Sequence, residues 1–292
     1  MEAARTSIRR ALGTKDSNGK LHPCNVGRMP RAAGAGQLPP KYEMPESSAE
    51  EWKPVPLGGS SIAVMSDFQI PFHDIPAIRA AAAWLKRRKP DVLLINGDLI
   101  DFQTISRFEC NPAFRDLPGD IGKTTQMLGW LRGQFPKARI VWKLGNHEER
   151  WEKHLWQSPL NGIPDFELSR VLKCEQLGVE VVGNRLPVMA GRLPILHGHE
   201  FQMGMAVSVN PARTTFLRTS HIAMIGHNHQ TSEHTQTDMW RKTLTVWSTG
   251  CLCGLWPNFA RVNRWNHGFA HIEISGDDFE VTNKRIQEGR VL

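Results

Sequence analysis

Long hydrophobic runs are missing from this 292-residue chain. No stretch of about 18 apolar residues is present, so we expect neither a transmembrane helix nor a membrane partner. The N-terminus also lacks the apolar segment and cleavage site of a secretory signal. The five cysteines are an odd number and show no disulfide framework, which is typical of a reducing compartment. We therefore expect a cytoplasmic protein.

Acidic residues are scarce at the start of the chain. Residues 1–41 contain eight basic side chains but only Glu2 and Asp16, so +6 of the total net charge of +7 lies there. Because this segment is also rich in Gly, Pro and Ala, we expect residues 1–55 to form a basic, disordered tail. A solubilising role and a weak contact with nucleic acid both remain open for it. Residues 56–292 are then the folded domain, close to neutral and, in a chain with 40% hydrophobic residues, able to bury a core.

Strand and helix patterns alternate after residue 55. Short apolar runs predict strands at 61–65, 92–95, 139–144, 179–182, 193–196 and 222–225. Helical patterns predict helices at 76–89, 120–135, 148–156 and 167–177. Beyond residue 231 the chain becomes β-rich, with a strand at 243–248 and a hairpin formed by 268–275 and 279–286. This order predicts an α/β (α+β) fold in which helices cover sheets.

Five of the apolar runs are followed directly by side chains that can bind metal. The segments that follow them are Asp67-Phe68-Gln69, Gly97-Asp98-Leu99-Ile100-Asp101, Gly145-Asn146-His147-Glu148, His197-Gly198-His199 and Gly226-His227-Asn228-His229. Ligand sites in open α/β sheets form at the carboxyl ends of strands, so we expect these side chains to meet at one sheet edge. Their oxygen and imidazole donors suit Mn, Fe, Zn or Mg, with manganese favoured. Two ions about 3.5–4 Å apart need a bridging carboxylate, for which Asp98 is a good candidate.

Together these segments resemble the calcineurin-like metallophosphoesterase superfamily over residues 58–292. The stretch Thr249-Gly250-Cys251-Leu252-Cys253, with Trp265 and Gly268-Phe269, is similar to a bacterial and phage branch of it. The resemblance implies a four-layer αββα sandwich of two mixed β-sheets flanked by helices. It also implies a metal-dependent hydrolase in which a hydroxide shared by two divalent ions attacks phosphorus in line.

The resemblance implies roles for eight residues of these segments. Asp98 bridges the ions; Asp67 and His229 bind the first ion, and Asn146, His197 and His227 bind the second. His147 binds no metal but stabilises the leaving oxygen, and Asp101 holds it in place.

One position departs from the family pattern. The first segment usually reads Asp-x-His, and here Gln69 offers a carbonyl oxygen instead of an imidazole. We therefore expect a first ion that is bound less tightly, or a preference for Mn or Mg over Zn. Two alternatives remain open: His73 replaces the missing imidazole, or the first site is only partly filled.

Several other residues have two possible roles. His199 either contacts the phosphate or is a turn residue, and Arg150 either reaches a phosphate or pairs with a helix carboxylate, which we favour. Cys251 and Cys253 fit small buried residues better than metal ligands. The run 86–89, Lys-Arg-Arg-Lys, complements a helix dipole or forms a nucleic-acid patch. Three tryptophans near the late segments, Trp240, Trp256 and Trp265, either pack or stack a base.

The function that fits best is a phosphodiesterase or nuclease acting on nucleotides or nucleic acid. A phosphomonoesterase, acting on proteins or small molecules, is the alternative within the same chemistry. Gln69 leaves a third reading open, a non-catalytic binding protein on a degenerate phosphoesterase fold. A structural zinc protein, which would unfold on chelation, is a further possibility.

Overall fold

The computed structural model describes residues 44–108, 111–183, 185–201 and 209–292. The chain divides after Glu51, and the described residues before that point, 44–51, form no helix or strand. All described helices and strands lie in Trp52–Leu292. Most of the predicted tail lies outside the described residues, so its disorder and the boundary at residue 55 remain predictions.

A seven-stranded sheet forms the first layer of strands, in the order β13-β12-β11-β2-β3-β4-β5. Strands β2 to β5 run parallel, and β11, β12 and β13 pair antiparallel, so the sheet is mixed. The bounds are β2 Ser61–Met65, β3 Val92–Asn96, β4 Arg139–Lys143, β5 Val179–Val182, β11 His267–Ser275, β12 Asp278–Gln287 and β13 Arg290–Val291.

A six-stranded sheet forms the second layer, in the order β1-β6-β7-β8-β10-β9. It is also mixed: β7, β8 and β10 run parallel, whereas β9 pairs antiparallel with β10 and β6 pairs antiparallel with β7. The bounds are β1 Val55–Pro56, β6 Val188–Ala190, β7 Leu193–Ile195, β8 Ala223–Ile225, β9 Ser232–Thr237 and β10 Thr243–Ser248.

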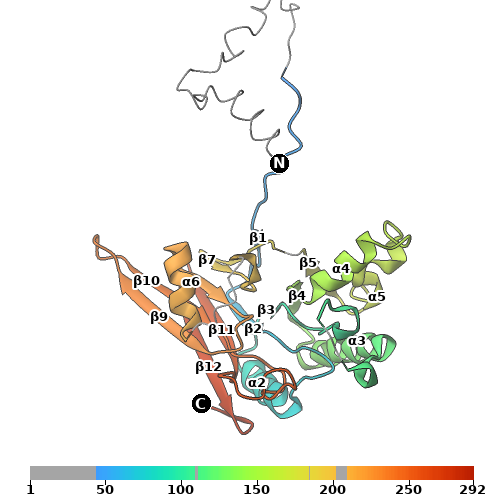
Figure 1. Ribbon diagram of the computed structural model, residues 1–292. Helices are drawn as coiled ribbons and strands as arrows, with labels where there is room; N and C mark the ends of the chain where they lie inside the picture. The colour runs from blue at the N-terminus through green and yellow to red at the C-terminus, as the bar shows by residue number, and fades with distance from the viewer. Residues whose placement is uncertain (1–43, 109–110, 184, 202–208) are drawn as a thin grey trace, which may run out of the picture. The chain divides into compact units, whose positions relative to one another are not determined.

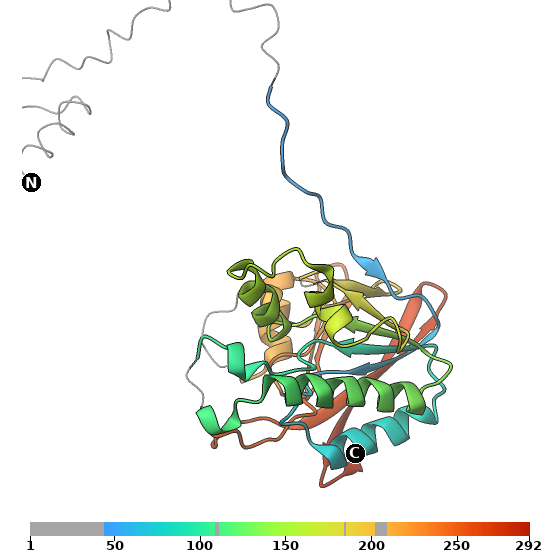
Figure 2. The same cartoon turned by 90° about the vertical axis from the view of Figure 1, so that its right-hand side faces the viewer.

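Helices cover the outer faces of both sheets (Figures 1 and 2). Their bounds are α2 Ile75–Lys86, α3 Leu117–Gln134, α4 Glu148–Trp156, α5 Leu168–Val171 and α6 Pro211–Thr219, with 3-10 turns at Gln103–Ile105, Pro112–Phe114, Pro164–Phe166 and His199–Phe201. In the part of the chain that the structure describes, no helix combines the length and the apolar character needed to cross a membrane.

Two hydrophobic cores separate the layers. Alternate residues of β2 point to opposite faces, so Ala63 and Met65 pack with α2 and α3 while Ile62 and Val64 face the second sheet. The second core continues into β6, β7, β8 and β10, and a small third cluster joins α6 to the far face of the six-stranded sheet. This confirms the predicted αββα sandwich.

The predicted helix at 167–177 was too long. Its α-helical part ends at Val171, and the chain continues in turns to Gly178. Lys173 adopts a left-handed conformation with φ of 55°, which a continuing right-handed helix does not allow. The sequence analysis also missed α6, a short helix, and β9, an edge strand with almost entirely exposed polar residues and hence no apolar alternation.

Candidate metal centre

The five segments with metal-binding side chains meet at the carboxyl ends of strands from both sheets. Strands β2, β3 and β4 lie next to one another in the seven-stranded sheet, and β7 and β8 are neighbours in the six-stranded sheet. The expected single sheet edge is therefore corrected to two edges, one from each layer. Hydrogen bonds join the two edges, since His227 N–H donates to Asp67 Oδ2 at 3.0 Å and the Asn96 side-chain amide donates to Leu196 O at 2.9 Å.

The backbone of these segments is held in an uncommon conformation. Five of the seven predicted metal ligands have φ between 49° and 64°: Asp67, Gln69, Asp98, His227 and His229. Non-glycine residues rarely occupy this left-handed region, and they do so mainly where the surrounding structure forces them. The turn that brings each ligand inward is thus fixed by its neighbours rather than by its own preference.

Two glycines allow the segments to approach closely. A Cβ on Gly97 would lie 2.3 Å from His197 Nδ1, and a Cβ on Gly145 would lie 2.3 Å from Asp98 Oδ1. Gly97 also has φ of 81°, which suits a residue without a side chain. Larger residues here would push apart the side chains that the strands bring together.

The first group of predicted ligands surrounds Asp67, which is fully buried. His229 Nε2 lies 3.2 Å from Asp67 Oδ1, and the amide nitrogen of Gln69 lies 3.2 Å from the same His229 nitrogen. The other carboxylate oxygen of Asp67 accepts hydrogen bonds from Ser66 Oγ at 2.5 Å and from the His227 N–H. Asp67 Oδ1 is therefore the oxygen that points to the ligand group.

The second group surrounds Asp98. His197 Nε2 lies 3.2 Å from Asp98 Oδ2, and the ligand atoms of Asp98, His197 and His227 all lie within 4.8 Å of one another. The Nδ1 atom of His197 lies 2.8 Å from Asn96 O and donates its proton to that oxygen, so Nε2 is the nitrogen that can bind a metal ion. His197 Nε2 is also 3.9 Å from Asp67 Oδ1, so the two groups adjoin.

Four atoms of the predicted ligand set are buried without a hydrogen-bond partner among the described residues. They are Asp67 Oδ1, Asp98 Oδ2, Asn146 Oδ1 and His197 Nε2; the two carboxylate oxygens each lie 3.2 Å from an imidazole nitrogen, which can pair with them only when it carries a proton. Leaving a buried polar atom unpaired costs about 1–3 kcal/mol, so such atoms are uncommon unless something else satisfies them. Divalent ions would satisfy all four, and three of the atoms are oxygens, which suit hard cations. The residues present therefore fit a metal centre.

The charges of the site also favour cations. Burial raises the pKa of Asp98, but the charges of His147 and His197 outweigh it, and the pKa lies well below its usual range. Burial lowers the pKa of His197 and His229, yet Asp98 and Asp67 raise these pKa values to about 10 and about 9. The carboxylates thus attract positive charge strongly, and a divalent ion would supply it in place of the imidazole protons.

His147 lies beside the two groups and is held by Asp101. Its Nδ1 is 2.6 Å from Asp101 Oδ1, its Nε2 is 3.6 Å from Asp98 Oδ2, and its N–H donates to Asp98 Oδ1 at 3.0 Å. Arg150 donates to Asp101 O at 2.6 Å and to His147 Nε2 at 3.0 Å. Because guanidinium can only donate, this Nε2 accepts and Nδ1 carries the proton toward Asp101. Arg150 pairs with Asp101 (3.2 Å), a loop carboxylate rather than the helix carboxylate that we favoured.

Two buried carboxylates hold the segments in place, and the sequence analysis gave neither a role. Glu148 accepts N–H bonds from Asp98, Leu99, Ile100 and Gly145 at 2.7–3.2 Å. Glu200 accepts the N–H groups of His197 and Gly198 and pairs with Lys143 Nζ at 2.5 Å. Burial raises the pKa of Glu200, but Lys143, His199 and His197 outweigh it and lower it to about 2. The signals available in the sequence were Glu148 within a ligand segment, Glu200 directly after another, and Lys143 in an apolar strand.

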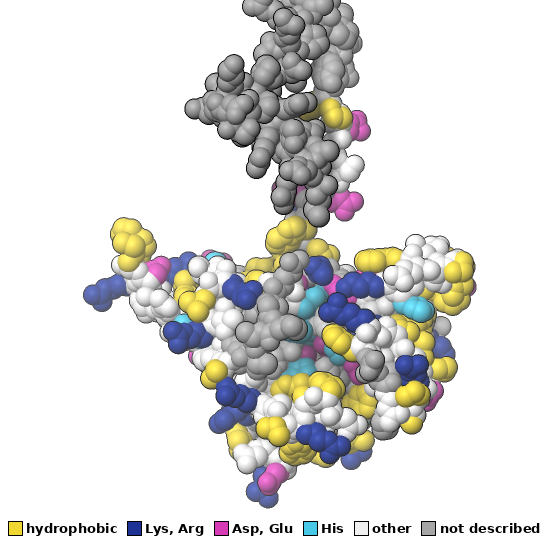
Figure 3. Space-filling model, viewed as in Figure 1, with side chains coloured by type: hydrophobic (Ala, Val, Ile, Leu, Met, Phe, Trp, Pro, Cys, Tyr) yellow, Lys and Arg dark blue, Asp and Glu magenta, His cyan; other side chains and the backbone are white. Residues whose placement is uncertain are grey.

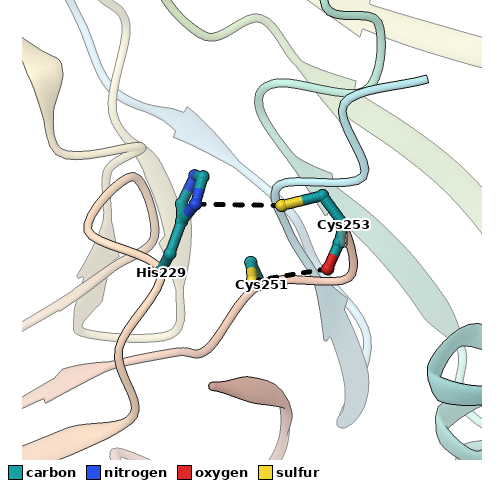
Figure 4. A group of neighbouring side chains, drawn as sticks. All are labelled: His229, Cys251 and Cys253. Atoms are coloured by element: carbon teal, nitrogen blue, oxygen red, sulfur yellow. Dashed lines mark hydrogen bonds between the residues drawn. The ribbon is translucent and has the colours of Figure 1, made fainter. Parts of the chain in front are cut away.

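A pair of cysteines stands behind His229 (Figure 4). Cys253 Sγ lies 3.8 Å from His229 Nδ1, the ring nitrogen that faces away from Asp67, and the Cys251 thiol contacts Cys253 O at 3.9 Å. Both are fully buried, and the backbone between them pairs with the loop after β2, since Leu252 N–H donates to Asp67 O. Two clusters of metal-binding atoms lie within 4.8 Å of one another among the described residues: His229 with Cys251 and Cys253, and Asp98 with His197 and His227. His73, the alternative ligand, pairs with Cys253 through the backbone and belongs to neither cluster.

Pockets open on two sides of the centre. One of about 540 Å³ reaches Asn146, His199 and His227, and basic residues line its wall: Arg107, Arg150, Lys153 and Arg185. The other, of about 330 Å³, reaches Gln69 and Asp101 and is lined by the aromatic side chains of Phe72, Trp256 and Phe259. Figure 3 shows the histidines and acidic side chains near the middle of this face, with Lys and Arg around them.

The chain is similar to several known proteins. Gene 54 protein of Mycobacterium phage L5 is 26% identical over 246 residues, which cover 78% of this chain and 94% of that protein. Vacuolar Protein Sorting 29 from Cryptosporidium parvum is 15% identical with a TM-score of 0.42, covering 80% of this chain and 95% of that one. A dimetal phosphatase from Danio rerio is 11% identical with a TM-score of 0.40, and the match covers 82% of this chain and 98% of that one.

A family model decides the assignment. The model described as calcineurin-like phosphoesterase matches residues 60–269, which is well over half of the chain and contains all five ligand segments. The chain belongs to the calcineurin-like phosphoesterase family and is a metal-dependent phosphoester hydrolase.

Proposed function

We propose that this hydrolase is a dinuclear phosphodiesterase or nuclease that acts on nucleotides or nucleic acid. The observation that supports it most is the set of four buried, unpaired ligand atoms where the two sheet edges meet. In this proposal Asp98 bridges the ions, and the other ligands are Asp67, Gln69 and His229 for the first and Asn146, His197 and His227 for the second. Manganese is favoured, since the donors are oxygen and imidazole and none is a thiolate.

The residues around the ions have separate tasks. Two bound divalent ions would lower the pKa of water and neutralise charge on the phosphate. Asp101 fixes the ring of His147, so that Nε2 faces the place where the leaving oxygen develops charge. To donate a proton there, Nε2 must be released from Arg150 Nη2 and must first take up a proton from solvent. Nη2 of Arg150 can then donate to a phosphate oxygen, while Nη1 stays on Asp101. Glu148 and Glu200 keep the ligand segments in position through their backbone N–H groups.

The two pockets favour a diester over a monoester. A phosphodiester has a substituent on each side of the phosphorus, and pockets lie on both sides of the proposed centre. The basic wall of one suits further phosphates, and the aromatic wall of the other suits a base. A monoester would leave one of these pockets without a substrate group.

Hydrolysis of two small substrates tests the proposal. With added Mn, we expect faster turnover of bis-p-nitrophenyl phosphate than of p-nitrophenyl phosphate, and no turnover by Asp98→Asn. A chelator should abolish activity while circular dichroism shows the fold largely retained. Faster hydrolysis of the monoester would favour the phosphomonoesterase. No hydrolysis with Mn, Mg, Fe or Zn would contradict the proposal and favour a binding protein, and unfolding on chelation would favour a structural zinc site.

A further inference from the structure

A groove without acidic side chains runs along the outside of the molecule between α2 and α3. The two helices lie side by side on the outer face of the seven-stranded sheet (Figure 2). Between them are a cavity of about 620 Å³ and one of about 270 Å³, and both are lined by Arg79 and Trp130. Within the described ranges of the chain, no Asp or Glu lines either cavity. The two cavities are therefore parts of one groove, which we call the α2–α3 groove.

The α2–α3 groove reaches the metal centre. His73 lines both the 270 Å³ cavity and the aromatic pocket beside Gln69 and Asp101. The path thus leads from Asp101, past His73, to Lys86 at the end of α2. Helix α2 has 12 residues, and a rise of 1.5 Å per residue makes it about 18 Å long. A substrate in this groove would be a chain rather than a single small molecule.

The charges that line the groove are positive. The basic residues are Arg79, Lys86, Arg87 and Lys123, all of them exposed. Lys123 interacts with the buried carboxyl of Asp120, but among the described residues no carboxylate lies within ion-pair distance of any of the four. In the pocket beside Asn146, by contrast, Arg150, Lys153 and Arg185 all have carboxylate partners. Several cations along a groove suit the evenly spaced charges of a phosphate backbone.

Aromatic side chains accompany these charges. Trp256 and Phe259 are 76% and 82% exposed beside the centre, and the half-buried Trp130 lines both cavities between α2 and α3. Exposed rings of this kind stack on bases, but only when the faces of the bases are accessible. A duplex hides those faces, and an acidic peptide has none.

We propose that the α2–α3 groove binds a single-stranded nucleic acid and leads it to the metal centre. This inference rests on the proposed function and specifies its substrate class. The phosphates lie against Arg79, Lys86 and Lys123, and bases nearest the cleaved bond stack on Trp256 and Phe259. The basic run 86–89 then contributes to substrate binding through its first two residues, besides completing the end of a helix.

Binding of a labelled phosphorothioate single strand, followed by fluorescence anisotropy, tests the charged part of the groove. The groove variant is Arg79→Gln/Lys86→Gln/Lys123→Gln, and the control with the same charge is Arg213→Gln/Arg218→Gln/Lys242→Gln, on α6 and the end of the β9–β10 hairpin. We expect the groove variant to bind at least ten-fold more weakly. The slope of log K against log salt concentration should become shallower by about 2, since each of the three lost phosphate contacts contributes about 0.7 to that slope. Equal losses in both variants would overturn the proposal.

The aromatic part has its own matched pair. Trp256→Ala should lower the affinity about ten-fold without changing the salt dependence, because stacking releases no counterions. Trp240→Ala removes a tryptophan that is equally exposed, at 79%, on the hairpin between β9 and β10, and should bind as the wild type does. Equal effects of the two, or equally strong competition by polyglutamate, would overturn nucleic acid as the occupant. Tighter binding of a duplex of the same length would overturn single-strandedness.

Hydrolysis of bis-p-nitrophenyl phosphate separates this inference from the proposed function. This substrate is too small to reach the groove, so its turnover reports the metal centre alone. If the enzyme hydrolyses this substrate but the groove variant binds the strand as tightly as the wild type does, only the role of the α2–α3 groove is contradicted. If no metal supports hydrolysis, the proposed function itself is contradicted.

Discussion

The two halves of the proposed metal centre differ in how open their ligand atoms are. In the half around Asn146, His197 and His227, Asn146 Oδ1 and His197 Nε2 are buried without hydrogen-bond partners among the described residues. In the half around Asp67, Gln69 and His229, Asp67 Oδ1 is likewise without such a partner, but the Gln69 amide nitrogen lies 3.2 Å from His229 Nε2, the atom that would bind the ion. The second half is thus ready for a cation, whereas the first is partly closed on itself.

The difference has a structural cause. An imidazole at position 69 would offer a nitrogen lone pair, while an amide presents a donor or an acceptor depending on its rotation. Turning the amide over would place its oxygen near the first ion, so Gln69 can still ligate, but the donor bond to His229 must be given up. We infer that the two ions bind with unequal affinity, and substitutions in each half can enlarge or remove that inequality.

Loss of a ligand from the open half should have the largest effect. For His197→Asn we expect turnover to fall by more than the roughly 100-fold that follows loss of a supporting partner of a metal ligand. The metal content, measured by inductively coupled plasma mass spectrometry, should fall by at least one ion. His221→Asn, on an exposed turn near the start of β8, is the control and should behave as the wild type. Two retained ions in His197→Asn would contradict the proposed ligand.

The open half also depends on a buried ion pair. Lys143 has no exposed side-chain surface, and its partner Glu200 holds the backbone of His197 and Gly198. Lys143→Met would leave the Glu200 charge buried and unpaired, which costs about 3–5 kcal/mol. Urea unfolding should show this decrease in the free energy of unfolding.

The matched control breaks an exposed pair. Arg192 and Asp278 lie 2.9 Å apart with 54% and 78% of their side chains exposed. Arg192→Met should leave the midpoint of urea unfolding essentially unchanged, because solvent screens an exposed pair. If the two variants lost equal stability, the pair of Lys143 and Glu200 would not be what supports the His197 segment.

This ion pair shows where the sequence was insufficient. The five ligand segments could be predicted because each follows an apolar run, and strands end in loops whose side chains meet. Lys143 lies near the end of such a run, but the local sequence 139–143, Arg-Ile-Val-Trp-Lys, does not indicate that its ammonium group is buried rather than exposed to water. Its partner lies 57 residues away, so the pairing appears only once two strands from different sheets lie side by side.

The division of the segments between two sheets was hidden for the same reason. Strands β2, β3 and β4 are consecutive and parallel, so a common edge follows from their order along the chain. The placement of β7 and β8 depends on pairing with β6 and β10, which local patterns do not specify. Strand β9 was missed because a polar edge strand resembles a loop, whereas the αββα layers came from the family resemblance and were confirmed.

Restoring the imidazole should make the two halves more alike. For Gln69→His we expect the weaker of two Zn dissociation constants from isothermal titration calorimetry to fall on the order of ten-fold, since metal affinity responds to such changes by 10–100-fold. The left-handed backbone of Gln69, with φ of 49°, is tolerated by histidine about as well as by glutamine. Gln126→His, on the exposed side of α3, is the control. An unchanged dissociation constant would mean that Gln69 does not face the first ion.

The smallest effect is expected behind the first half, at Cys253. A metal-binding histidine usually donates its other N–H to a carboxylate or a carbonyl, and here Nδ1 of His229 meets a thiol at 3.8 Å. Since sulfur accepts hydrogen bonds weakly, Cys253→Ser should change the affinity for the first ion by less than about ten-fold, the lower limit for a strong supporting partner. Cys174→Ser, at a buried thiol in the core beneath the helices, should leave this affinity unchanged whatever it does to stability. A larger loss of affinity in Cys253→Ser would show that the thiol orients His229 more firmly than the 3.8 Å distance suggests. The weaker binding of the first ion would then be due to Gln69 alone.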